Sequence, residues 1–167
     1  MTEEEQSQLI KLLEKLEPGL LPLDIFLQIA RLSVLPIIEV VPLRRMEQTE
    51  ILLLPRLATD KIWPNAMHIP GTEVRADDKG DFKAGFQRIQ DELGSTQIGE
   101  PSFVRTMFHQ SKRGWELAFI YWTEVTGEAH KGQFYKTSQL PASIIESQKE
   151  FIEEAVKSFE KSGFILR

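Results

Sequence analysis

Three charged residues near the middle of the chain have types and spacing that suit phosphate chemistry. Arg88, Asp91 and Glu92 stand at positions i, i+3 and i+4, so a helix would present them on one face. Carboxylates are hard ligands for Mg²⁺ or Mn²⁺, and such an ion neutralises phosphate oxygens and orients an attacking water. A guanidinium repels the ion and competes for the carboxylates through paired hydrogen bonds. The face is therefore either a metal site or a set of ordinary ion pairs within one helix.

The residues around this face predict a turn, an acidic loop and a helix. The run Ile69-Pro70-Gly71-Thr72 ends at a Pro-Gly break, and residues 73–78 form the loop. The predicted helix has one apolar stripe and ends at Gly94, which is a typical C-cap. The stripe consists of Phe82, Phe86, Ile89 and Leu93. Gly85 lies inside this helix, where glycine costs about 1 kcal/mol relative to alanine unless it permits a close approach of backbone.

The segment from Gly71 to Gly94 resembles the Nudix box. That box reads glycine, five residues, glutamate, seven residues, and then Arg-Glu-apolar-x-Glu-Glu-x-Gly. The residues that match its end are Ile89, Asp91, Glu92 and Gly94. Strands and a C-terminal helix predicted outside the box also look like the family's frame, so the resemblance covers roughly residues 37–160. It implies a Nudix-like α/β/α sandwich with a mixed sheet.

Several positions of the box depart from the family's pattern. Gln87 replaces the arginine, Arg88 replaces the first glutamate, and Lys79 replaces the loop glutamate. The interval from Gly71 to Gly94 is also two residues longer than the box requires. These departures favour a catalytically inactive Nudix-fold module that binds a ligand or a protein partner.

The resemblance also implies an activity, a metal ion and a substrate class. Nudix enzymes hydrolyse a diphosphate linked to another moiety with the help of Mg²⁺ or Mn²⁺. On this chain, Glu92 is then the main metal ligand and catalytic residue, and Asp91 assists it. Arg88 contacts the substrate phosphate, while Gly71 and His68 border the substrate pocket. We expect a divergent hydrolase of nucleotide-linked diphosphates, acting on a nucleoside diphosphate derivative, with the inactive binding module as the alternative.

Other charged and aromatic residues have no spacing that assigns them to the site. Additional carboxylates that would complete a metal site are Glu73, Asp77, Asp78, Asp81, Glu116, Glu124 and Glu128. We expect each of them to be a solvated surface carboxylate. Lys112-Arg113 fits a hairpin turn, and the aromatic residues, Trp63 among them, include candidates for base stacking but are typical of sheet faces.

The hydrophobic periodicity divides the chain into an N-terminal helical extension, residues 1–35, and a Nudix-like domain, residues 36–167. In the extension, Thr2 and Glu5 have capping-box spacing, Pro18-Gly19 ends the first helix, and a second helix covers residues 23–32. We expect this helical hairpin to pack on the domain; the alternative is a partner surface or a homodimer contact. The predicted strands are residues 37–43, 50–55, 102–108, 115–124 and 133–136, before a final helix.

Composition and charge exclude several classes of protein. The chain has 167 residues, a net charge of −5 and no cysteine, which excludes disulfides, thiolate metal sites and cysteine nucleophiles. The acidic balance argues against general affinity for a nucleic-acid backbone. The most apolar region, residues 20–43, is interrupted by prolines and charges, so we expect no membrane span. The N-terminus lacks the pattern of a secretory signal, and we expect a cytoplasmic protein.

Overall fold

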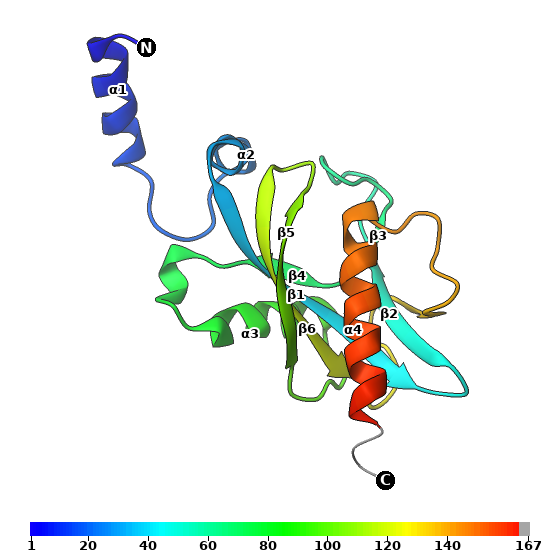
Figure 1. Cartoon of the computed structure of the whole chain (residues 1–167). Helices are drawn as coiled ribbons and strands as arrows, with labels where there is room; N and C mark the ends of the chain where they lie inside the picture. Colours follow the sequence, from blue (N-terminus) through cyan, green and yellow to red (C-terminus); the bar gives the residue numbers. More distant parts are fainter. Residues whose placement is uncertain (164–167) are drawn as a thin grey trace.

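The computed structural model describes residues 1–163 and has a three-layer arrangement of helices on both faces of one sheet (Figure 1). The α-helices are α1 (Glu3–Leu13), α2 (Leu23–Leu32), α3 (Phe82–Leu93) and α4 (Lys149–Ser162). The strands are β1 (Val34–Arg45), β2 (Thr49–Pro55), β3 (Met67–His68), β4 (Gly71–Glu73), β5 (Ser102–Gln110), β6 (Trp115–Glu124) and β7 (Gln133–Lys136). Short 3-10 helices are η1 (Ala76–Asp78) and η2 (Glu146–Gln148).

The strands form one mixed sheet in the order β3-β2-β1-β6-β5, with β4 added beside β1 and β7 beside β2. The long central pair, β1 and β6, is parallel, and the other pairs are antiparallel. Strand β1 begins at Val34, before the predicted start at Ile37, although it contains Pro36. Proline lacks an N–H, but the Pro36 carbonyl still accepts a hydrogen bond from the Val74 N–H.

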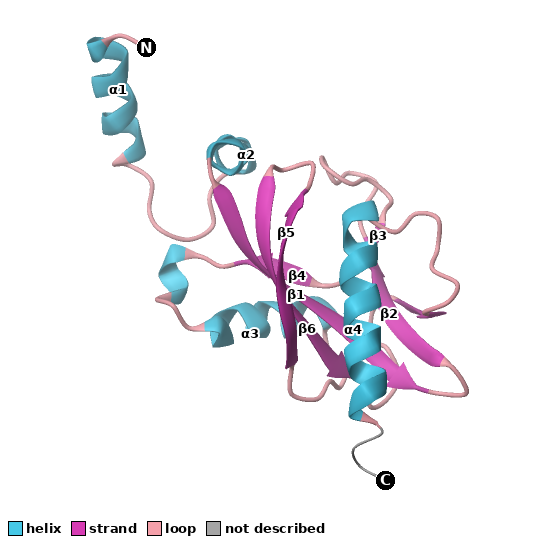
Figure 2. Ribbon diagram, in the orientation of Figure 1, coloured by secondary structure: helices cyan, strands magenta, loops and turns pink. Residues whose placement is uncertain are grey.

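Alternation along β1 places two apolar cores on opposite faces of the sheet. Ile37 and Val41 belong to the core beneath α4, whereas Ile38 and Val40 belong to the core beneath α3. Side chains of a strand point alternately to its two faces, so this pattern follows directly from the sequence. Figure 2 shows α3 and α4 on opposite sides of the magenta strands. This is the predicted α/β/α sandwich with a mixed sheet.

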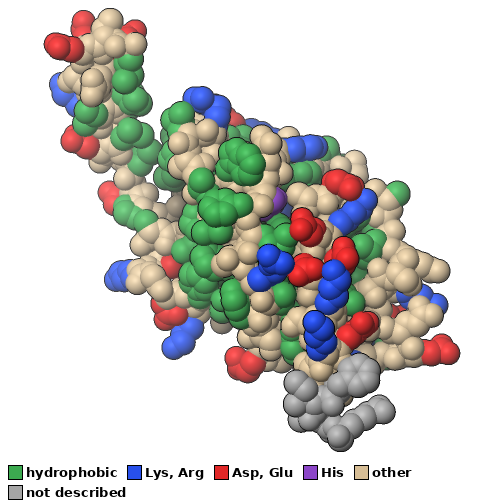
Figure 3. Space-filling model, in the orientation of Figure 1, with side chains coloured by type: hydrophobic (Ala, Val, Ile, Leu, Met, Phe, Trp, Pro, Cys, Tyr) green, Lys and Arg blue, Asp and Glu red, His purple; other side chains and the backbone are tan. Residues whose placement is uncertain are grey.

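The two N-terminal helices differ in how they meet the domain. Ala30 of α2 is fully buried, and Phe26 packs against the core beneath α4. The predicted capping box of α1 forms between Thr2 and Glu5, but α1 buries none of its residues. It projects away from the sheet, and its exposed apolar side chains are visible in Figure 3. The expectation that the hairpin packs on the domain therefore holds for α2 and is wrong for α1.

Both ends of α3 have the capping residues that the sequence predicts or permits. Asp81 caps its N-terminus by accepting a hydrogen bond from the Lys83 N–H, and Gly94 follows its last residue with a φ of 68°.

Within residues 1–163, no helix is long and apolar enough to cross a bilayer. The final residues of the predicted domain, 164–167, lie outside the described part of the chain.

Candidate ligand site at the split of the sheet

The sheet splits between β1 and β2, and the candidate site lies at this split. The two strands pair only near their hairpin, from Leu43 opposite Ile51 to Arg45 opposite Thr49. Farther along, β1 pairs with β4 and β2 pairs with β3. The chain between β3 and β4 passes through the gap, where the Pro70 carbonyl accepts a hydrogen bond from the Val40 N–H at 3.0 Å. Side chains from both faces of the sheet can therefore meet there.

Arg88 turns away from its helix and binds the loop before it. Its Nη1 and Nη2 atoms donate hydrogen bonds to the two carboxylate oxygens of Asp78, at 2.7 and 2.8 Å. It also donates to the Thr72 hydroxyl at 3.1 Å and to the Glu73 carbonyl at 3.0 Å. The predicted ion pairs of Arg88 with Asp91 and Glu92, within one helix, are therefore replaced by a pair between helix and loop.

The partner of Arg88 is a buried carboxylate that is ionised. The Asp78 side chain is only 3% exposed. The hydrogen bonds from Arg88 lower the pKa of Asp78 to about 2 despite its burial, and the Arg75 N–H adds a further hydrogen bond. A paired, buried charge of this kind fixes the loop against α3, because separating the partners would leave a charge without water.

Glu92 lies at the split, beside Gly71 and His68. Burial raises the pKa of Glu92, although a hydrogen bond from the Gly71 N–H opposes that rise. The Nε2 atom of His68 lies 3.6 Å from a Glu92 carboxylate oxygen. Burial lowers the pKa of His68 to about 4, and its Nδ1–H donates to the Ile69 carbonyl at 2.8 Å. His68 is therefore neutral near pH 7, and the contact is not an ion pair.

Asp91 has different surroundings from Glu92. Its side chain is exposed and accepts a hydrogen bond from Gln87 Nε2 at 2.9 Å. The structure thus brings three predicted site residues together at the split (Gly71, His68 and Glu92), joins Arg88 to the loop, and leaves Asp91 at the surface. Among residues 1–163, no three His, Asp or Glu side chains are close enough together to hold a metal ion.

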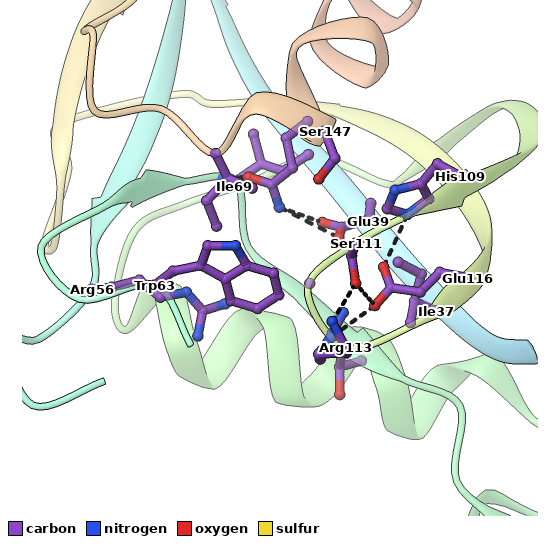
Figure 4. Close-up of a pocket in the computed structure, with 14 residues that line it drawn as sticks. Ile37, Glu39, Arg56, Trp63, Ile69, His109, Ser111, Arg113, Glu116 and Ser147 are labelled. Carbon is purple, nitrogen blue, oxygen red and sulfur yellow. Dashed lines mark hydrogen bonds and ion pairs between the residues drawn. The ribbon is translucent and has the colours of Figure 1, made fainter. Parts of the chain in front are cut away.

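A polar pocket continues from the split on the α4 side of the sheet (Figure 4). Its cavity volume is about 20 Å³, which suffices for one or two water molecules. Glu39, on β1, lies at its centre and is 5% exposed. Burial raises the pKa of Glu39 to about 8, so this carboxyl is largely protonated at pH 7. Gln148 Nε2 donates to Glu39 at 3.2 Å, and Gln148 Oε1 accepts from the Ile69 N–H.

The far end of the pocket holds an ionised carboxylate, Glu116, with two hydrogen-bond donors and a neighbouring imidazole. Glu116 accepts hydrogen bonds from Arg113 Nε at 2.7 Å and from the Ser111 hydroxyl at 2.8 Å. His109 Nε2 lies 2.9 Å from its other oxygen. Burial by itself would raise the pKa of Glu116, but His109, Arg113 and Ser111 outweigh it and lower the pKa. At pH 7, therefore, Glu39 is largely protonated and Glu116 is ionised, although both line one pocket.

Trp63 faces these groups across the pocket, with two arginines against its ring (Figure 4). The guanidinium carbons of Arg56 and Arg113 lie 5.4 and 5.3 Å from the ring centroid, within the range of a cation–π interaction. Asp60 holds this segment in place by accepting hydrogen bonds from the Ile62 and Trp63 N–H groups. The Nε of Arg56 is buried and has no hydrogen-bond partner in the structure.

Sequence reasoning missed most of this pocket. Glu39 is one of the charges that interrupt the apolar residues 20–43, and Lys112-Arg113 fits a hairpin turn, so neither pattern indicates a pocket. The available signal for Glu39 is an acidic residue at an inward position of residues 34–43, which are otherwise apolar. Asp78 and Glu116 were named as candidate carboxylates, but with no spacing that assigned them a partner.

Comparisons with known proteins identify the fold. No protein-family model and no curated protein matches the sequence. A mutT/nudix family protein from Listeria innocua superposes with a TM-score of 0.60 at 15% identity, covering 79% of this chain and 97% of that one. The C. elegans Ap4A hydrolase gives 0.55 at 15% identity, covering 76% and 98%. These matches confirm that the chain has the Nudix fold.

A further neighbour was crystallised with ligands. The NUDIX domain of Shewanella oneidensis NrtR, complexed with ADP ribose, gives a TM-score of 0.62 at 16% identity, covering 95% of this chain and 99% of that one. NrtR itself was also solved with a 27mer DNA. Because this neighbour was solved with DNA, the expected absence of nucleic-acid binding in our chain stays a prediction. The cytoplasmic location and the homodimer also stay predictions.

Proposed function

We propose that this chain is a Nudix-fold module that binds a small organic diphosphate and does not cleave it by the family's metal-dependent route. The observation that carries the proposal is the Arg88–Asp78 pair. Arg88 stands where the box has a metal-binding glutamate, and its guanidinium is fixed by two hydrogen bonds to a buried carboxylate. At this position the chain therefore offers a guanidinium, which has no lone pair to coordinate a cation, in place of a carboxylate ligand.

The remaining carboxylates fit Mg²⁺ or Mn²⁺ poorly. Mg²⁺ requires close to octahedral geometry, with ligands at about 2.0–2.1 Å. Asp91 is exposed and engaged by Gln87, while Glu92 is drawn toward Gly71 at the split.

The polar cavity itself is too small for a diphosphate, but its arginines also line the larger cavity beside it, where they would bind phosphate. Arg56 has a buried Nε with no hydrogen-bond partner, and Arg113 lies across the same tryptophan ring. Guanidinium groups bind phosphate oxygens through charge-assisted hydrogen bonds. Protonated Glu39 adds a neutral O–H donor close to these cations. A nucleotide-linked diphosphate is the ligand class that the Nudix resemblance implies, and the neighbour bound to ADP ribose supports it.

A second candidate function is metal-dependent hydrolysis, with Glu92 as the main ligand and catalytic residue and Asp91 assisting. One observation favours it. Glu92 lies beside the Gly71 N–H and His68 at the split, next to the polar pocket. In this alternative, Arg88 would touch substrate phosphate, which requires it to leave Asp78.

Titration calorimetry with ADP-ribose, in EDTA and then in Mn²⁺, separates the two functions. The proposal predicts that ADP-ribose binds in EDTA and that Arg113→Gln weakens this binding at least tenfold. It also predicts that incubation of the protein with ADP-ribose and Mn²⁺ releases no phosphate-containing products. As a matched control, Arg105→Gln removes an arginine from β5, outside the pocket. Turnover with Mn²⁺ that is lost in Glu92→Gln would instead establish the hydrolase.

A further inference from the structure

The N-terminal extension builds a second pocket next to the polar one. Its cavity volume is about 660 Å³, within the range of small-molecule sites. The linker between α1 and α2 forms one wall, and the start of β1 and the loop before β3 form others. Its lining is mainly apolar and includes Leu20, Leu21, Phe26, Leu35 and Trp63.

The charged groups around this second pocket are mostly paired with one another. Arg75 donates to Glu73 at 2.8 Å, and Arg56 donates to Asp60 at 3.2 Å. Lys61 lies 3.7 Å from Asp24. Paired side chains of this kind leave the cavity wall dominated by aliphatic surface. Such a wall favours a hydrocarbon group, because the hydrogen-bonding edges of a nucleobase would find few partners in it.

The two pockets meet at one place. Arg56, Trp63 and Arg113 line both cavities. The polar pocket is small and holds the two arginines, whereas the apolar pocket is large and offers mainly carbon. A ligand that satisfies both would place an anionic end against the arginines and an apolar body beneath the N-terminal linker.

We infer that the apolar pocket holds the hydrocarbon part of the ligand, and that the ligand is a phosphate or diphosphate ester of an apolar alcohol. The inference rests on the proposed diphosphate site for the ligand's anionic end, and it replaces the nucleoside part of the proposed ligand with a hydrocarbon. It adds that the N-terminal extension is part of the binding site. It also assigns a role to residues 17–23, which pass over the cavity instead of packing into a core.

The test compares three probes by titration calorimetry with the full chain: inorganic pyrophosphate, geranyl diphosphate and ADP-ribose. Geranyl diphosphate carries a ten-carbon chain on the same anionic group as pyrophosphate. We expect it to bind at least tenfold more tightly than pyrophosphate. Equal affinities would overturn the inference, since the hydrocarbon would then contribute nothing.

Matched pairs of leucines locate the hydrocarbon. The variant Leu20→Gln/Leu21→Gln makes the wall of the apolar pocket polar, whereas Leu12→Gln/Leu13→Gln makes the same change on α1, which does not line it. The first variant should lose most of the tenfold preference for geranyl diphosphate over pyrophosphate while keeping its affinity for pyrophosphate. The second variant should keep both the preference and the affinity. An advantage that survives in the first variant would place the hydrocarbon elsewhere and overturn the inference.

The same experiment separates this inference from the proposed function. Binding of ADP-ribose without a preference for geranyl diphosphate over pyrophosphate would leave the proposed function standing and the inference refuted. A leucine-dependent preference for geranyl diphosphate, with no ADP-ribose binding, would support the inference and refute a nucleotide ligand. Binding of none of the three probes would refute both.

Discussion

Arg88 on α3 and Asp78 on η1 form a bidentate ion pair, with Nη1–Oδ1 and Nη2–Oδ2 distances of 2.7 and 2.8 Å. The pair joins the loop of the degenerate box to its helix and occupies the position where the family places a metal ligand. Asp78 is almost fully buried, so its negative charge depends on Arg88. In the proposed function, this ion pair stands where a catalytic Nudix box would place a metal ligand.

We predict that this pair contributes strongly to stability. Arg88→Gln leaves the Asp78 carboxylate buried and unpaired, and should lower the free energy of unfolding by about 2–4 kcal/mol. Asp78→Asn should cost a similar amount, and the double variant should cost clearly less than the sum, because the two residues act on each other. Urea unfolding at pH 7 measures all three variants.

An exposed pair provides the control for that cycle. Arg105 and Glu154 form a salt bridge at 3.2 Å on the surface, with 54% of the Arg105 side chain exposed. Exposed pairs gain little, because water and salt screen them. Arg105→Gln should therefore change stability far less than Arg88→Gln, and equal losses would contradict the assignment of Arg88 as a structural residue.

We predict that stability falls as the pH rises from about 6.5 to 8. The folded state raises the pKa of Glu39 from 4.5 to about 8, so the fold binds a proton that the unfolded chain has released. His68 acts in the opposite sense, because its pKa falls from 6.5 to about 4 and stability rises over that interval. The two effects oppose each other up to pH 6.5, and Glu39 alone acts above it.

Each pH unit in that upper window should cost about 1.4 kcal/mol, or about 2 kcal/mol in total. Glu39→Gln replaces the carboxyl with a neutral group of similar shape, so the slope between pH 6.5 and 8 should disappear. Urea unfolding at four pH values tests this. A slope that persists unchanged in Glu39→Gln would show that Glu39 is not the titrating group.

We predict that Gly85→Ala destabilises the protein although alanine favours helices. A Cβ atom at position 85 would lie 2.6 Å from the Cδ1 atom of Ile38, which is fully buried. Overpacking of this kind typically costs about 1–3 kcal/mol, more than the helix-propensity gain of about 1 kcal/mol. Thermal unfolding should show a lower Tm, and Gly85→Ala/Ile38→Val, which removes the clashing methyl, should recover part of it.

The sequence predicted the frame of this fold well because its signals were local. The apolar stripe of α3, its glycine C-cap and the alternating residues of the central strands depend only on neighbouring positions. The box resemblance added the α/β/α architecture. The start of β1 and the exposure of α1 were not predicted, because both depend on which surfaces meet in three dimensions.

The candidate site was harder to predict because its partners lie far apart in the sequence. Arg88 and Asp78 are separated by a loop whose length departs from the box, so no spacing rule paired them. Glu39, Trp63 and Arg113 come from three separate segments, and only the split of the sheet brings them to one pocket. Such contacts are set by topology and cannot be read from periodicity.

The most direct test of this account is a calorimetric titration with Mn²⁺, in the wild type and in Glu92→Gln. Because Arg88 replaces a metal ligand and remains paired with Asp78, we predict no specific Mn²⁺ binding at millimolar concentrations in either protein. Stoichiometric binding in the wild type that disappears in Glu92→Gln would contradict the account, and would show that the box still holds a metal ion.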